Sequence, residues 1–268
     1  GLGYEPEQLR IVEETLKHPH GMVLMTGPTG SGKTVSLYAC LNVLNHEGVN
    51  ISTVEDPVEI FMHGINQVSI NEKAGVQFAT ALRAFLRQDP DILMVGEIRD
   101  LETADIAVKA AQTGHLVFST LHTNDATMAL TRLMQMGVTP YNVAASVNLI
   151  VAQRLVRRLC SCKKPVKLDA YLLQSAGMDE AQAQQPDWQA FAPNGCEQCY
   201  GTGYIGRIGI FQVVPVLPSM QSLIARNASS QELSQLAQEE GYLNLRQAGL
   251  RKVVAGISSL EEVMSATL

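Results

Sequence analysis

Long hydrophobic runs are absent from this sequence of 268 residues. A membrane-spanning helix needs roughly 20 consecutive apolar residues, and the longest candidate, Val143 to Ala152, is interrupted by Ser146 and Asn148. There is also no signal-like segment after Gly1, so we expect a cytoplasmic chain that is an excerpt of a longer polypeptide. No run in this sequence therefore predicts a membrane-spanning helix.

Positive charge and cysteine are also scarce. The formal net charge is −6, which argues against a nucleic-acid track and predicts no nucleic-acid partner. Only five cysteines are present, and four of them form two tight pairs. This pattern suits a metal site in a reducing compartment better than a disulfide framework. The 46% apolar content is ample for the core of one large domain or two smaller ones.

Residues 27–34 form the most informative stretch, Gly-Pro-Thr-Gly-Ser-Gly-Lys-Thr. A short apolar run precedes it and a helix-forming run follows, which is the context of a phosphate-binding P-loop. Backbone N–H groups of the loop and the helix N-terminus favour phosphate oxygens. Lys33 would reach the β- and γ-phosphates of ATP, and the Thr34 hydroxyl would hold Mg²⁺. The predicted nucleotide-binding residues are Gly27, Thr29, Gly30, Ser31, Gly32, Lys33 and Thr34.

The alternation of apolar runs with helical stretches predicts an α/β fold with a parallel-rich sheet. We expect a helix from Glu7 to Leu16, a helix over 141–158, a hairpin or edge strand over 205–216 and helices over 219–268. A polar stretch over 182–189 reads as an insertion or mobile loop. The strands are expected at 21–26, 51–54, 92–95 and 116–120. Three parts follow: a core over 1–158, a cysteine-containing segment over 159–216 and a helical subdomain over 217–268.

Acidic residues follow two of the predicted strands. Glu55 and Asp56 come after 51–54, and Glu97 comes after 92–95, where ligands of a parallel sheet collect. A carboxylate there could hold Mg²⁺ through water or orient the attacking water, so Glu97 and Glu55 are the candidate catalytic acids. Asp91 lies at the opposite end of its strand, roughly 20 Å from Glu97, and is expected to cap the entry turn.

The same reasoning separates two histidines. His122 follows the strand over 116–120 and should face the nucleotide, whereas His115 precedes it and is more consistent with a structural role. Arg83 and Arg87 share one helix face. They either contact a phosphate across a subunit boundary or form a solvated surface, and the spacing favours neither. Arg99, just past Glu97, is a third candidate.

The cysteine pairs are Cys160 with Cys162 and Cys196 with Cys199. They resemble two zinc knuckles, although the first is one residue shorter than the ordinary C-x-x-C spacing. Four thiolates could still surround one Zn²⁺ in a structural site. The alternative is a set of free cysteines or a degenerate site without metal.

Taken together, these stretches resemble a known family. The resemblance is to the secretion ATPases, which drive type II secretion and type IV pilus assembly. Their Walker A, Asp box, Walker B and His box are similar to stretches of this chain at residues 27–34, 54–59, 86–91, 95–100 and 113–124. The resemblance extends to 201–211 and 259–263. Runs 85–88 and 110–114 look most like the pilus extension branch, and the four cysteines resemble extension and secretion ATPases rather than retraction motors.

The resemblance implies a RecA-like core, a homohexameric ring with ATP sites between subunits, and a cytoplasmic motor on an inner-membrane platform protein. Membrane association would then be peripheral, through partners. The resemblance also places Glu97, Glu55, His115 and His122 in family boxes, puts Arg83, Arg87 and Arg99 near the nucleotide, and matches Arg207 to a segment bordering it. The alternatives are a type II secretion motor, a nucleotide-gated binding module without useful turnover, and a DNA motor, which the acidic balance opposes.

Overall fold

The computed structural model describes residues 2–184 and 187–267. These residues form two compact units. We call residues 6–152 with 213–242 the sheet unit. The described residues of 1–5, 153–212 and 243–268 form the cysteine unit. The division into three parts at 158 and 216 stays a prediction.

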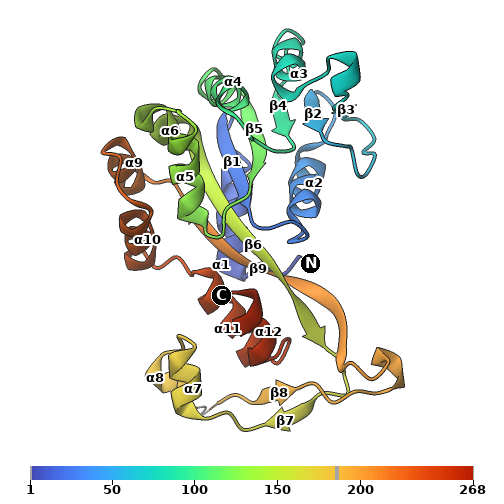
Figure 1. Cartoon of the computed structure of the whole chain (residues 1–268), viewed down its shortest axis with the longest axis vertical. Coiled ribbons are helices and arrows are strands. Elements are labelled where there is room, and N and C mark those ends of the chain that lie inside the picture. The colour runs from blue at the N-terminus through green and yellow to red at the C-terminus, as the bar shows by residue number, and fades with distance from the viewer. Residues whose placement is uncertain (1, 185–186, 268) are drawn as a thin grey trace. The chain divides into compact units, whose positions relative to one another are not determined.

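Within the described residues, seven strands form one sheet in the order β3-β2-β4-β5-β1-β6-β9 (Figure 1). Pairing is parallel between β1 and both β5 and β6, between β2 and both β3 and β4, and between β4 and β5. Strand β6 begins in the sheet unit and ends in the cysteine unit, and β9 begins in the cysteine unit and ends in the sheet unit. The strands are β1 (Gly21–Thr26), β2 (Ile51–Glu55), β3 (Asn66–Ser69), β4 (Ile92–Val95), β5 (Leu116–Leu121), β6 (Val147–Leu159) and β9 (Tyr204–Pro215).

The central strands are buried along their whole length, which explains why they read as continuous apolar runs. Every residue of β1, β2, β4 and β5 is buried. Strands covered on both faces favour apolar side chains at every position rather than alternation. Phe118, Leu24 and Leu93 are 0% exposed and lie in this core. The four strands predicted from the sequence are therefore confirmed.

Helices of the sheet unit pack against these strands and against one another. Asp100 caps the start of α4 by accepting a hydrogen bond from the Thr103 N–H at 2.8 Å, and Asp125 caps α5 by accepting one from the Thr127 N–H at 2.8 Å. These caps begin a helix a few residues after the ends of β4 and β5. The helices are α1 (Pro6–Thr15), α2 (Lys33–Leu44), η1 (Glu72–Ala74), α3 (Phe78–Phe85), α4 (Leu101–Gln112), α5 (Ala126–Gln135), α6 (Pro140–Ser146), α9 (Pro218–Ala225) and α10 (Ser230–Glu239).

The prediction of one long helix over 141–158 is wrong. Helix α6 ends at Ser146, and the chain continues as β6 from Val147. Val147, Leu149, Ile150 and Val151 pair with β1. The apolar residues suit either a helix or a buried strand, and pairing with the adjacent strand decides the outcome.

The cysteine unit combines two small strands with short helices. Strands β7 (Lys164–Val166) and β8 (Ala190–Ala192) pair antiparallel. The edge-strand prediction is confirmed by β9, which ends the sheet order, and the helical prediction for the C-terminal part is confirmed by α9 to α12. The polar stretch over 182–189 begins within α8, and residues 185 and 186 lie outside the described residues. The helices of this unit are α7 (Ala170–Ser175), α8 (Glu180–Ala183), η2 (Glu197–Cys199), α11 (Leu245–Val254) and α12 (Leu260–Ala266).

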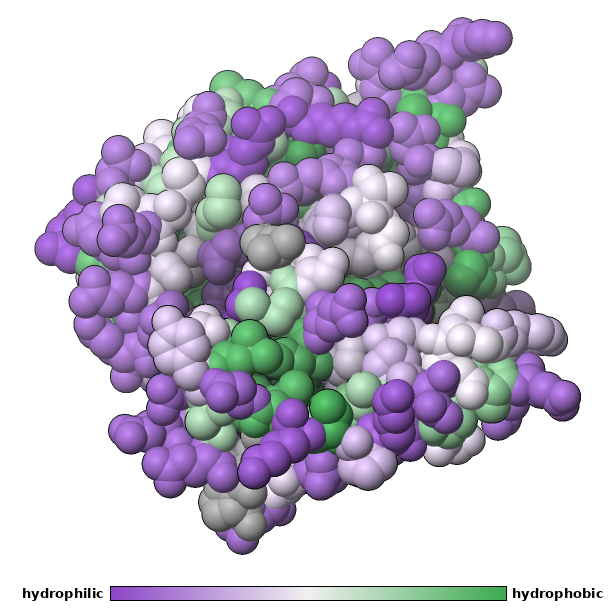
Figure 2. Space-filling view, turned by 60° about the horizontal axis from the view of Figure 1, so that its bottom comes forward, coloured by the Kyte–Doolittle hydropathy of each residue, from purple (hydrophilic) through white to green (hydrophobic). Residues whose placement is uncertain are grey.

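Among helices in residues 2–184 and 187–267, none is both long and apolar enough to cross a membrane. Figure 2 colours one face by hydropathy, and hydrophilic residues predominate there, with a hydrophobic patch in the lower middle and smaller hydrophobic areas towards the edges.

Candidate functional site

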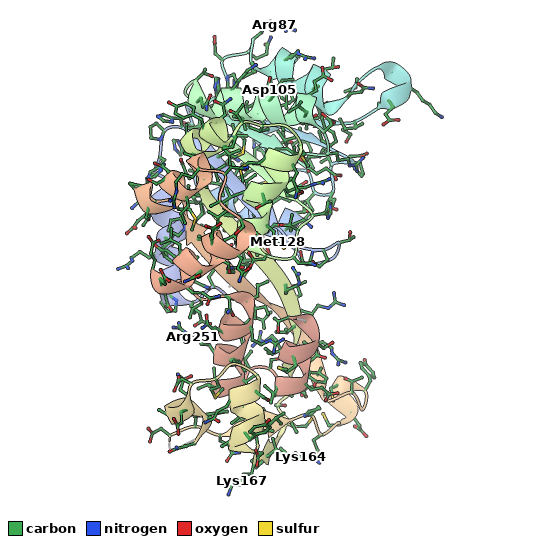
Figure 3. All side chains as sticks on the ribbon, turned by 60° about the vertical axis from the view of Figure 1, so that its left-hand side comes forward. Arg87, Asp105, Met128, Lys164, Lys167 and Arg251 are labelled. Atoms are coloured by element: carbon green, nitrogen blue, oxygen red, sulfur yellow. The ribbon has the colours of Figure 1, made fainter. Side chains whose placement is uncertain are left out.

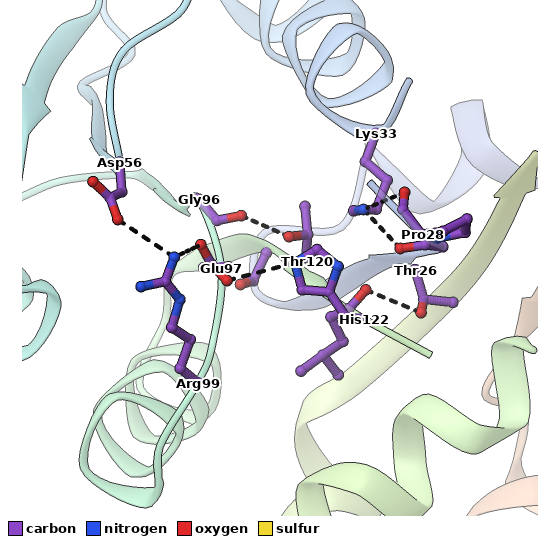
Figure 4. Close-up of polar contacts among 12 residues, drawn as sticks. Thr26, Pro28, Lys33, Asp56, Gly96, Glu97, Arg99, Thr120 and His122 are labelled. Atoms are coloured by element: carbon purple, nitrogen blue, oxygen red, sulfur yellow. Dashed lines mark hydrogen bonds and ion pairs between the residues drawn. The ribbon is translucent and has the colours of Figure 1, made fainter. Parts of the chain in front are cut away.

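A cavity of about 450 Å³ lies in the sheet unit beside the P-loop. Gly32 adopts φ +87° immediately before α2, a conformation that glycine reaches without steric cost. The turn allows α2 to start at Lys33 directly after the loop. The Lys33 ammonium donates to the carbonyl oxygens of Gly27 at 2.7 Å and Pro28 at 3.1 Å (Figure 4). Strand β1 therefore delivers the loop to the sheet's carboxyl edge, and the loop positions the lysine.

The predicted nucleotide-binding residues mostly line this cavity. Thr29, Gly30, Gly32, Lys33 and Thr34 are on its wall. Ser31 is 3% exposed, and its hydroxyl has no hydrogen-bond partner among the described residues. A buried hydroxyl without a partner is costly, so a phosphate oxygen arriving at the loop would satisfy it. The P-loop thus fits a nucleoside triphosphate.

Both candidate acids reach the same cavity from neighbouring strands. Glu55 ends β2, and Glu97 follows β4 after Gly96. The Gly96 N–H donates to the Val54 carbonyl at 2.8 Å, and a Cβ at Gly96 would stand 3.3 Å from the Glu55 Cα. The glycine permits the close approach of the two strand ends. Sequence reasoning placed both carboxylates at this edge, and the structure brings them together.

Glu97 lies between two basic side chains, Arg99 and His122. Arg99 donates to its Oε1 at 2.5 Å and also lies 3.4 Å from Asp56 Oδ2 (Figure 4). The hydrogen bond from Arg99 is the main cause that lowers the pKa of Glu97, and His122 contributes through its charge. The carboxyl group is therefore ionised at neutral pH, as a water-orienting or metal-facing carboxylate requires.

The histidines lie at opposite ends of β5. The His122 Nε2 is 3.5 Å from Glu97 Oε2, and the residue lines the cavity. The His115 ring instead contacts the Ala110 carbonyl oxygen at 3.0 Å, and its own carbonyl accepts from the Gly21 N–H. Asp91, also at the entry edge, accepts from the Asn50 N–H at 2.7 Å. These three residues lie at the strand ends expected from the sequence, and their roles stay predictions.

Three polar residues that hydrogen-bond to Glu55 were not predicted from the sequence. Tyr38 donates to Glu55 Oε2, Thr53 donates to Oε1 at 2.6 Å, and the Gln67 amide donates to Oε1 at 3.3 Å. Thr53 could have been found from the sequence, because residues two apart on a strand share one face. Gln67 could not, since its position opposite Thr53 depends on the β2–β3 register.

The remaining predicted arginines lie outside this cavity. Arg83 on α3 donates to Glu102 at 2.7 Å, with 52% and 61% of the two side chains exposed. Arg87 donates to the Arg83 carbonyl oxygen at 2.9 Å and lies at the periphery of the ribbon in Figure 3. Arg207 is exposed on the part of β9 that belongs to the cysteine unit. Roles for these three at a nucleotide stay predictions.

The four paired cysteines form one cluster in the cysteine unit. All four Sγ atoms lie within 4.8 Å of one another. The Sγ atoms of Cys160 and Cys196 are 3.8 Å apart, those of Cys162 and Cys199 are 3.9 Å apart, and those of Cys196 and Cys199 are 3.7 Å apart. A tetrahedron with Zn–S bonds of about 2.3 Å has edges of about 3.8 Å. The shorter C-x-C pair is therefore compatible with a four-thiolate metal site.

Backbone groups favour a thiolate in this cluster. The N–H groups of Cys196 and Gly203 each donate to the Cys199 sulfur at 3.1 Å. Burial opposes ionisation, but these bonds outweigh it and lower the pKa of Cys199 to about 6. The fifth cysteine, Cys40, is buried in α2, and burial raises its pKa to about 12. Burial also raises the pKa of Cys162 within the cluster to about 12, so it is the grouping of the four sulfurs that distinguishes the cluster from Cys40 as a metal ligand set.

With the geometry in place, comparison with known proteins identifies the family. A family model described as "Type II/IV secretion system protein" matches residues 1–265. The chain belongs to this family. Its resemblance to the secretion ATPases, inferred from the sequence boxes, is thereby confirmed.

Individual relatives place the chain within the family. It is 56% identical over 267 residues to the type IV pilus assembly ATPase PilB of Acinetobacter baylyi, covering 99% of this chain and 46% of that protein. It is 47% identical over 267 residues to the type II secretion system protein E of Pseudomonas aeruginosa, covering 99% of this chain and 52% of that protein. The chain thus spans about half the length of these curated relatives.

A solved structure supports the fold. The crystal structure of the pilus retraction motor PilT with bound ADP matches with a TM-score of 0.72 and 28% identity, covering 99% of this chain and 65% of that one. The predicted α/β fold with a mostly parallel sheet is confirmed.

Proposed function

We propose that this chain is the ATP-hydrolysing part of a motor that powers type IV pilus extension. The observation that carries the proposal is the meeting of Lys33, Glu55 and Glu97 on one cavity wall. The high identity to a pilus assembly ATPase favours pilus extension over type II secretion, whose protein E is less similar.

The residues of the cavity divide the work of phosphoryl transfer. Lys33 and the N–H groups of the P-loop bind the β- and γ-phosphates, and the Thr34 hydroxyl holds Mg²⁺. When bound, Mg²⁺ neutralises phosphate charge. Glu97, kept ionised by Arg99, orients water toward the terminal phosphate, and Glu55 adds a second carboxylate to the cavity from β2. His122, beside Glu97, acts as a sensor of charge or hydrogen bonding at the nucleotide.

Replacing Glu97 by Gln tests the proposal. The substitution keeps the side-chain size but removes the charge, so ATP turnover should fall by about 10²- to 10⁴-fold. Binding of a non-hydrolysable ATP analogue, measured by fluorescence, should change by less than about threefold. The matched control is Glu14→Gln on α1, which removes an exposed carboxylate from the same unit. Undiminished hydrolysis in Glu97→Gln would remove this residue from the mechanism, and unmeasurable turnover in the wild-type chain would favour a binding module.

The assembly and its location complete the proposal. We infer a homohexameric ring at the cytoplasmic face of the inner membrane, docked on a platform protein and without a nucleic-acid partner. The exposed positions of Arg83 and Arg87 suit contacts with a neighbouring subunit's nucleotide. Arg207 is proposed to border a nucleotide in the assembled ring.

The cysteine cluster is proposed to hold one structural Zn²⁺. Its four sulfur atoms leave no coordination position for a substrate, which argues against a catalytic metal.

A further inference from the structure

The Glu55 carboxylate accepts three side-chain hydrogen bonds. Glu55 is 3% exposed, although it lines the cavity. Burying a carboxylate is expensive unless hydrogen bonds replace its water. The two oxygens accept bonds from Tyr38, Thr53 and Gln67, all of them neutral donors. Because three directions are fixed at once, the carboxyl plane has little freedom to turn.

The tyrosine donor ties Glu55 to the phosphate-binding loop. Tyr38 lies on α2, the helix that begins with Lys33. The hydroxyl of Tyr38 therefore links the end of β2 to the element that carries the phosphate lysine. Thr53 and Gln67, in contrast, are cross-strand partners on β2 and β3 and link Glu55 only to the sheet. Tyr38 is thus the contact that sets the carboxylate relative to the P-loop helix.

Tyrosine is suited to act as a permanent donor here. Burial raises the pKa of Tyr38 to about 12, and its hydrogen bond with Glu55 adds to the shift, while backbone hydrogen bonds with Ile60 and Glu59 oppose it. The phenol stays protonated across the physiological pH range, so its O–H always donates to the carboxylate and Tyr38 does not take up or release a proton.

Gln67 extends the arrangement to an exposed segment. Its amide oxygen accepts from the Met62 N–H at 2.7 Å, and its amide nitrogen donates to the Ile60 carbonyl oxygen at 3.1 Å as well as to Glu55. The segment after β2 is therefore fastened to the same side chain that fastens the carboxylate.

We propose that Tyr38 is a positioning residue for the hydrolysis: its hydroxyl, with Thr53 and Gln67, orients the Glu55 carboxylate with respect to the P-loop helix. The inference rests on the proposed function, because it assigns Tyr38 a part in the same ATP hydrolysis. It assigns Tyr38 no contact with the nucleotide itself.

Replacing Tyr38 by Phe removes the hydroxyl and keeps the ring. The kcat for ATP should fall about tenfold, as expected for a lost hydrogen bond to a charged group, while KM and the affinity for a non-hydrolysable ATP analogue stay within about twofold. Tyr141→Phe is the matched control, because that tyrosine is 74% exposed on α6. Thermal melting of each variant checks that it folds.

A double-mutant cycle separates positioning from a structural role. If Tyr38 acts through Glu55, adding Tyr38→Phe to Glu55→Ala should lower the residual single-turnover rate by less than about twofold. An equal loss in both backgrounds, or an unchanged kcat in Tyr38→Phe alone, would overturn the inference. If Glu55→Ala itself leaves turnover intact, the proposed role of Glu55 fails instead. Should Tyr38→Phe not fold, Thr53→Val takes its place in the cycle with Glu55→Ala, because the Thr53 hydroxyl donates to the same carboxylate.

Discussion

The nucleotide cavity and the cysteine cluster are built in different ways. The cavity gathers side chains from the carboxyl ends of adjacent parallel strands, where register fixes their neighbours. The cluster gathers sulfurs from the turn after β6 and from the short η2 helix, which backbone hydrogen bonds hold in place. The first site is held by strand pairing that needs no ligand. The second brings together four sulfur atoms within 4.8 Å of one another in a small unit, so a bound metal should matter more for its stability.

The largest effect should follow from breaking the cysteine cluster. In Cys199→Ser we expect loss of bound zinc and a fall of several kcal/mol in the unfolding free energy of the cysteine unit, since structural zinc contributes roughly 10 kcal/mol or more to small folds. Elemental analysis and thermal melting with a chelator measure both. Affinity of the sheet unit for an ATP analogue should change by less than about twofold.

Cys40→Ala is the control for that experiment, because Cys40 lies in α2 and outside the cluster. It should keep the zinc content of the wild type. Wild-type chain without zinc, and with melting that a chelator leaves unchanged, would contradict the contrast between the two sites.

A smaller effect concerns the charge at the nucleotide cavity. Arg99→Met removes the main cause of the lowered pKa of Glu97, so that pKa should rise and the acid limb of the kcat–pH profile should move to higher pH. The limb moves to higher pH because a carboxyl group with a higher pKa is protonated, and so inactive, at higher pH. The unfolding free energy follows the same direction: a carboxylate with a lowered folded-state pKa stabilises the fold above its unfolded pKa, and this contribution is lost as pH falls through the folded pKa. Since Arg99 is 58% exposed, turnover at neutral pH should fall by about fivefold or less through this interaction.

The control is Arg10→Met, which breaks an exposed pair with Glu14 on α1 and should leave the profile unmoved. An acid limb that stays in place in Arg99→Met would mean that Glu97 does not set it.

The smallest effect is expected at α3. Arg83→Ala breaks an exposed ion pair with Glu102, and the unfolding free energy measured in urea should change by less than about 1 kcal/mol. Turnover at concentrations where the chain assembles provides the second readout. A loss there that stability does not explain is the mark of the proposed contact across a subunit boundary, and unchanged turnover in both Arg83→Ala and Arg87→Ala would contradict it.

The same contrast explains what the sequence could predict. Glu55 and Glu97 were placed correctly because parallel strands with continuous apolar runs bring their carboxyl ends to one edge. The helix predicted over 141–158 was wrong because its apolar residues suit either element until pairing with β1 is known. Strand β3 was missed because it is short and three of its four residues, Asn66, Gln67 and Ser69, are polar.

Other features depend on contacts that no local pattern encodes. Tyr38 reads as one residue of a helix, and its hydrogen bond to Glu55 is known only from the folded structure, in which α2 packs on β1 and β5. The approach of the two cysteine pairs likewise depends on the fold, which brings Cys160 within 3.8 Å of Cys196 and Cys162 within 3.9 Å of Cys199, measured between sulfur atoms.

The most direct test of the central claim is a crystal structure of the chain with Mg²⁺ and a non-hydrolysable ATP analogue. The account predicts the terminal phosphate within hydrogen-bonding distance of the Lys33 ammonium, in the cavity that Glu55 and Glu97 also line. A nucleotide bound with its phosphates elsewhere, or with either carboxylate turned away from that cavity, would contradict it.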